Sequence, residues 1–99
     1  MNDYADRLRA HRRIAVLRHL EAAPEYVSNA AILAEVLAGL GLSVTRDQLL
    51  GELGWLREQG FVEFDPAAAF TVVVATRRGV EIARGLATHP GVHRPGPRL

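Results

Sequence analysis

The sequence predicts a small α+β domain that is mainly helical, with three helices, a two-stranded β-hairpin and a closing helix in that order. Three observations support this prediction. Apolar residues recur at helical spacing over the first sixty positions, a capping box precedes the third helix, and short β-branched and aromatic runs follow Gly60. The chain has 99 residues, 48% of them hydrophobic, which is enough for a single domain.

The first two helices have clear start and stop signals. The segment 3–22 contains no Pro or Gly, has an apolar face around Leu17, and ends before Pro24. Ser28 stands where the N-cap of a second, shorter helix belongs, and two nearby glycines end that helix.

The third helix has the strongest local signal. Thr45 and Gln48 have the spacing of a capping box, in which each side chain accepts a hydrogen bond from the other residue's backbone N–H. This predicts a helix from Arg46 to about Gln59, closed by Gly60. Its buried stripe consists of Leu49, Leu53 and Leu56. Trp55 lies beside the stripe, and we expect it to be a core or interface residue.

The β-branched runs 61–64 and 70–75 flank a five-residue loop and predict a β-hairpin. The second run is apolar on both faces, so one face of the hairpin must be covered by something other than water. We expect one of two arrangements. Either helix one covers one face of the hairpin and a second subunit covers the other, or a partner strand pairs with the edge of the hairpin. Both arrangements favour a homodimer, with helix one and the closing helix as the expected interface.

Thr76 is expected to cap the closing helix, which runs to about Ala87. The remaining residues, 88–99, contain three prolines and two glycines. The predicted organisation is therefore one domain over residues 1–87, followed by a flexible tail rich in Pro, Gly and Arg over residues 88–99.

Two stretches resemble known regulators. LGWLREQGFV at 53–62 resembles the junction between recognition helix and wing in ArsR-like and MarR-like proteins, and ATRRGVEIA at 75–83 resembles the segment that follows their wing. The Thr45–Gln48 segment and the PGV at 90–92 look like the small winged-helix proteins of Mu-like phages and prophages. The resemblance implies a winged helix-turn-helix fold and a DNA-binding transcriptional regulator of phage or prophage type.

In the resembled regulators the third helix enters the major groove of DNA. The positions that face DNA in them hold Leu50, Gly51, Glu52 and Gly54 here. Glycine has no side chain and a carboxylate only accepts, so we expect mostly phosphate contacts to double-stranded DNA and weak base readout. The expected contact residues are Thr45, Arg46, Gln48 and Arg57 around the third helix, with Arg77, Arg78, Arg94 and Arg98 as an electrostatic arm.

Charge is unevenly distributed along the chain. The net charge is only +1, and residues 28–66 hold two arginines against six acidic residues. The alternative function is therefore a protein-interaction module of a phage assembly or regulatory complex, in which this acidic surface binds a basic partner without specific DNA readout. Helix one carries a basic cluster of Arg7, Arg9, Arg12 and Arg13. Arg12 and Arg13 are interpreted as the solvated side of this helix, with phosphate contact as the alternative.

The sequence argues against catalysis, and we expect no enzyme activity, cofactor or metal. There is no Cys, and no Gly-rich nucleotide motif follows a strand. His89 and His93 are separated by Pro90 and Gly91, so no helix can aim both rings at one metal. The chain begins without a signal-peptide pattern and has no long uncharged stretch, so we expect a cytoplasmic protein without a membrane span.

Overall fold

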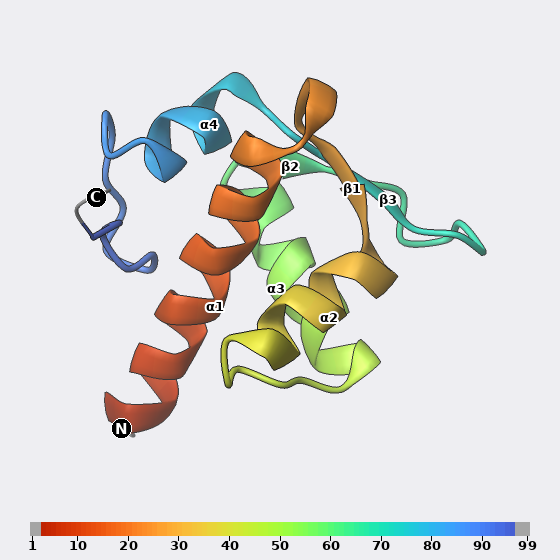
Figure 1. Cartoon of the computed structure of the whole chain (residues 1–99), viewed down its shortest axis with the longest axis horizontal. Helices are drawn as coiled ribbons and strands as arrows, with labels where there is room; N and C mark the ends of the chain where they lie inside the picture. Colours follow the sequence, from red (N-terminus) through yellow and green to blue (C-terminus); the bar gives the residue numbers. More distant parts are fainter. Residues whose placement is uncertain (1–2, 97–99) are drawn as a thin grey trace.

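A computed structural model describes residues 3–96, and the fold is α+β (Figure 1). Over this range, four α-helices accompany a three-stranded antiparallel sheet. In chain order the elements are α1 (Asp3–Ala22), the 3-10 turn η1 (Pro24–Tyr26), β1 (Val27–Asn29), α2 (Ala30–Gly39), α3 (Arg46–Glu58), β2 (Val62–Glu63), β3 (Val72–Ala75) and α4 (Arg77–Ala83).

The sheet contains the predicted hairpin and one strand more. β2 and β3 form the hairpin, and its loop projects away from the helices (Figure 1). β1 pairs with the other side of β3, with Val27 opposite Val74, which gives the strand order β1-β3-β2. The prediction of a two-stranded sheet is therefore corrected to three strands. β1 is only three residues long, and its partner lies more than forty residues away, so no local pattern marks it.

The helix caps confirm one prediction and correct another. Thr45 Oγ1 accepts from the backbone N–H of Gln48 at 3.1 Å, and Gln48 Oε1 accepts from that of Thr45 at 2.9 Å, so the capping box is present. The prediction that Ser28 caps α2 is wrong. Asn29 is the cap, its Oδ1 accepting from Ile32 at 2.9 Å, while Ser28 lies in β1.

The closing helix begins where predicted and ends earlier. Thr76 caps α4 by accepting from the backbone N–H of Gly79. The helix ends at Ala83 rather than near Ala87, because Gly85 takes a left-handed φ of 76° that stops it.

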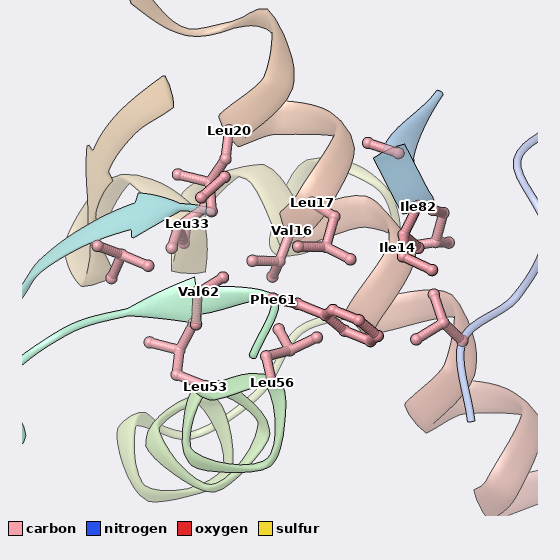
Figure 2. Packing of buried hydrophobic residues seen from close by; sticks show 14 of the residues in the cluster. Ile14, Val16, Leu17, Leu20, Leu33, Leu53, Leu56, Phe61, Val62 and Ile82 are labelled. Atoms are coloured by element: carbon pink, nitrogen blue, oxygen red, sulfur yellow. The ribbon is translucent and has the colours of Figure 1, made fainter. Parts of the chain in front are cut away.

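The hydrophobic core lies between the four helices and the sheet. Figure 2 shows Phe61 and Val62 between Val16 and Leu17 of α1 and Leu56 of α3. The predicted stripe of α3 is buried, with Leu49, Leu53 and Leu56 at 1% exposure or less. This packing fixes one face of α3 on the core and leaves its other face for contacts outside the core.

The segment after α4 packs on the domain. Val92 is buried, and the backbone N–H of His93 donates to the carbonyl of Ala10 on α1 at 3.2 Å. In Figure 1 this blue segment lies alongside α1. We call residues 89–93 the C-terminal strap. The interpretation of 88–99 as a flexible tail is thus corrected for the strap, because Val92 supplies an apolar contact that the Pro and Gly content obscures.

Candidate nucleic-acid interface

A groove of about 360 Å³ lies between α1 and α3. We call it the arginine groove. It is lined by Arg9, Arg12 and Arg13 of α1 and by Gln48, Gly51, Glu52 and Trp55 of α3. Three arginines thus face one carboxylate, and the face of α3 turned away from the core forms the opposite wall. The arrangement suits an anion rather than a cation or an apolar ligand.

The single carboxylate in the groove is already paired. Arg13 Nε donates to Glu52 Oε1 at 2.9 Å, and the two side chains are only 12% and 8% exposed. Arg13 also stacks on the Trp55 ring, with its guanidinium carbon 3.8 Å from the ring centroid, and its Nη1 donates to the carbonyl of Gly91 at 3.0 Å. Glu52 therefore adds no unpaired negative charge, and Arg13 is held in one position.

Arg12 supplies an unused donor in the same groove. Its Nε is buried and has no hydrogen-bond partner among residues 3–96. Arg9 forms an ion pair with Asp6 on the exposed side of α1. Across the groove, a Cβ added to Gly51 would meet nothing within 4 Å, so the surface of α3 is open to a close approach here.

The residues expected at the start of α3 lie at its exposed end. Thr45 and Arg46 are both exposed, and the Thr45 hydroxyl is engaged in the capping box. Gln48 uses its Oε1 in the same box, which leaves its amide NH₂ as the donor available to a ligand. Of the seven predicted contact residues that the structure describes, Gln48 alone is among those that line the arginine groove.

The other predicted arginines are distributed over several elements. Arg57 lies against the β2 end of the hairpin, donating to the Phe64 carbonyl at 3.4 Å with its guanidinium 4.9 Å from the Phe64 ring. Arg78 stands 5.7 Å from the Phe61 ring, and Arg77 lines a separate hollow beside Tyr26. Arg94 is exposed after the strap, and Arg98 lies outside the described residues.

Sequence reasoning left the α1 side of this site out of the predicted contact residues. Arg12 and Arg13 are partly buried, so their interpretation as the solvated side of helix one is corrected. Glu52, expected to face outward, is also buried, because it pairs with Arg13. The spacing of Arg9, Arg12 and Arg13 at i, i+3 and i+4 places all three on one face of a helix, and this signal could have identified the cluster.

The strap completes the groove at Trp55. The His89 ring packs edge-on against Trp55 at 5.1 Å between centroids, and a Cβ on Gly91 would lie 2.6 Å from the Trp55 ring. We therefore expect Gly91→Val to displace the strap, to expose the indole and to lower stability by about 1–3 kcal/mol. Trp55 is the sole tryptophan, so its fluorescence emission reports the change directly as a red shift.

The control for this prediction is Gly96→Val. A Cβ at Gly96 meets nothing within 4 Å, so its emission should match that of the unmodified protein. An unchanged Trp55 emission in Gly91→Val would contradict the packing of the strap on α3.

Among residues 3–96, no three His, Asp or Glu side chains come together as a metal site requires. The helices formed by the same residues are too short or too polar to cross a lipid bilayer.

Comparison with known proteins identifies a relative in a phage. The chain is 39% identical over 93 residues to the uncharacterized protein gp26 of Escherichia phage Mu, and the aligned region covers 94% of this chain and 96% of gp26. No family model matches the sequence, and no solved structure matches it. The aligned region thus extends over nearly the full length of both proteins. This chain belongs to the same family as gp26 of phage Mu.

Proposed function

We propose that this chain is a winged helix-turn-helix protein that binds double-stranded DNA and acts as a transcriptional regulator of the phage type. The order of helix, strand, helix, helix and hairpin, with β1 added to the hairpin at β3, is compatible with that fold. In this assignment α3 is the recognition helix and the β2–β3 hairpin is the wing. The resemblance of the segments at 53–62 and 75–83 to such regulators supports the same assignment.

The arginine groove is the observation that supports DNA binding best. Proteins bind the DNA backbone by placing several cations on one docking face. Here α1 contributes three arginines next to the exposed side of α3, and the pairing of Glu52 with Arg13 neutralises the one acid between them. The backbone phosphate would be attracted by the arginines of α1 and would accept from the amide of Gln48, while Gly51 lets it come close to α3.

Base readout in this assignment is weak. Gly51 and Gly54 lack side chains, and Glu52 is committed to Arg13. Specificity through hydrogen bonds to base edges needs several outward polar side chains on the recognition helix. We therefore expect the protein to bind duplexes of unrelated sequence with similar affinity and to be strongly sensitive to salt.

Fluorescence anisotropy with a labelled generic duplex at two salt concentrations tests the proposal. A protein that neutralises about three phosphates should lose ~40-fold in affinity between 50 and 200 mM salt. The double replacement Arg9→Ala with Arg12→Ala should weaken binding and flatten the salt dependence by about two charges, because it removes two groove cations.

Arg84→Ala is the control for the change in charge and, because it removes one cation, it is compared with the single replacement Arg12→Ala. Arg84 lies outside the arginine groove, in an exposed ion pair with Glu21 at 3.5 Å, so its removal should alter DNA binding much less. No binding by the unmodified protein at 50 mM salt and micromolar concentration would overturn the proposed function. Equal weakening by both variants would show that overall charge, and not the groove, accounts for binding.

The second candidate is the protein-interaction module. It is favoured by one observation, which is that the acidic residues of 28–66 other than Glu52 remain on the surface. The exposed acids are Glu35, Asp47, Glu58, Glu63 and Asp65. A basic partner protein would be attracted to this surface, and DNA would be repelled by it. Failure to bind duplex DNA at low salt, as described above, is the result that favours this candidate.

A further inference from the structure

A second hollow of about 610 Å³ lies beside β1, between the C-terminal end of α1 and the residues 70 and 72 at the start of β3. Its wall contains exposed apolar side chains, with Val27 at 36%, Ile32 at 42%, Phe70 at 65% and Val72 at 43%. Asp, Glu, Arg and Lys are absent from its lining among the described residues. We call it the apolar groove.

The apolar groove contains a strand edge with unused backbone groups. Ala30 donates to the Thr71 carbonyl, and hydrogen-bonded pairs alternate along an antiparallel ladder, so Val27 and Asn29 turn their backbone groups away from β3. The N–H of Val27 donates to the carbonyl of Pro24. The Val27 carbonyl and the Asn29 N–H remain on the outer edge, and neither has a partner within the described part of the chain.

The interface expected from the sequence is already used within the chain. The apolar face of α1 packs against α4, and Leu17, Leu20, Val80 and Ile82 are all buried by that contact and the core. These two helices therefore present little apolar surface to another subunit. The outer face of the strand 70–75, by contrast, is left uncovered at Phe70 and Val72.

We propose that the apolar groove is the interface of a homodimer in which two copies of β1 pair antiparallel about a two-fold axis at Ser28. In this arrangement the Asn29 N–H of each copy donates to the Val27 carbonyl of the other, and the two sheets join into one of six strands. Phe70 of each copy packs against Ile32 and Val72 of the other. The proposal is independent of DNA binding.

A second copy fits this groove better than a different protein does. The lining offers no charge with which to select a charged partner, and an uncharged surface can meet itself without bringing like charges together. The same surface also supplies both the projecting group, Phe70, and the hollow that receives it, as a two-fold interface requires. A bare strand edge next to an exposed aromatic ring is, moreover, an aggregation hazard unless it is paired.

Sedimentation equilibrium over about 10 to 200 μM protein tests the proposal. We expect the mass to approach twice the 10.8 kDa of one chain. Phe70→Glu should raise the dimer dissociation constant at least ~10-fold, because each interface would then bury two carboxylates. Ile32→Glu, on the other wall of the groove, should also raise the dimer dissociation constant. This second variant shows whether the effect belongs to the groove rather than to position 70 alone.

Leu86→Glu is the matched control, since Leu86 is 74% exposed and lies outside the apolar groove. It should dimerise as the unmodified protein does. Circular dichroism verifies that each variant is folded. A monomer at every concentration would overturn the proposal and leave the groove to a different partner, and so would folded Phe70→Glu and Ile32→Glu variants that remain dimeric. Either result leaves the DNA-binding test unaffected.

Discussion

Alanine at position 79 is expected to lower the free energy of unfolding by about 2–4 kcal/mol, a large share of the stability of a domain this small. Gly79 lies buried in the first turn of α4, and a Cβ there would be 2.0 Å from the carbonyl oxygen of Phe61. The Phe61 oxygen is a backbone atom directly before β2, so no side-chain rotation relieves the clash. The helix must move away from α3 and the sheet.

Moving α4 also breaks the contacts that depend on its closeness. The Thr76 backbone N–H donates to Phe61 O at 3.0 Å, and the Thr76 hydroxyl donates to Gly60 O at 2.6 Å.

Urea denaturation measures the loss in the free energy of unfolding. Gly54→Ala is the control, because a Cβ there meets nothing within 4 Å and alanine favours a helix by about 0.8–1 kcal/mol over glycine. The two alanines should therefore shift stability in opposite directions, and equal shifts would contradict the packing of α4.

The parts of the fold that could be predicted are those with local causes. The Thr45 and Gln48 capping box needs only residues three apart, and the stripe of α3 needs only helical spacing. The change from helical to strand pattern after Gly60 is local too, and Gly60 takes the left-handed φ of 80° that this turn requires.

The features that could not be predicted depend on residues far apart in the chain. β1 is a strand because Val27 meets Val74, and three residues carry no periodic signal of their own. The strap is ordered because Val92 is buried and His93 reaches Ala10, contacts that composition does not reveal. For the same reason no local pattern indicates the role of Gly79, which allows the close approach of α4 to Phe61.

The candidate site was predicted on one side only. The α3 residue Gln48 follows from the position of the third helix, but the arginines opposite it come from a helix some forty residues earlier. The role of Glu52 was obscured by the same separation. From its position on α3 alone, Glu52 is expected to face outward. Only its contact with Arg13 of α1 shows that it is buried.

Removing either member of the Arg13 and Glu52 pair is expected to lower the free energy of unfolding by about 3–5 kcal/mol, because each deletion leaves the other charge nearly buried without its partner. Replacing both together, by Arg13→Met and Glu52→Leu, should restore much of that loss, since apolar side chains of similar volume suit a buried position. Urea denaturation of the two single variants and the double variant gives the coupling energy.

The control is Arg84→Ala, which breaks the more exposed pair with Glu21 and should lower stability by at most about 1 kcal/mol. A loss in Arg13→Met no greater than this would show that the pair with Glu52 is not a buried one. The double variant Arg13→Met with Glu52→Leu also allows the effect of Arg13 on DNA binding to be measured apart from its effect on folding. It is expected to fold while lacking one cation of the arginine groove. Weaker DNA binding by this folded protein would place Arg13 itself on the phosphate-facing surface, whereas unchanged binding would confine Arg13 to holding α1, α3 and the strap together.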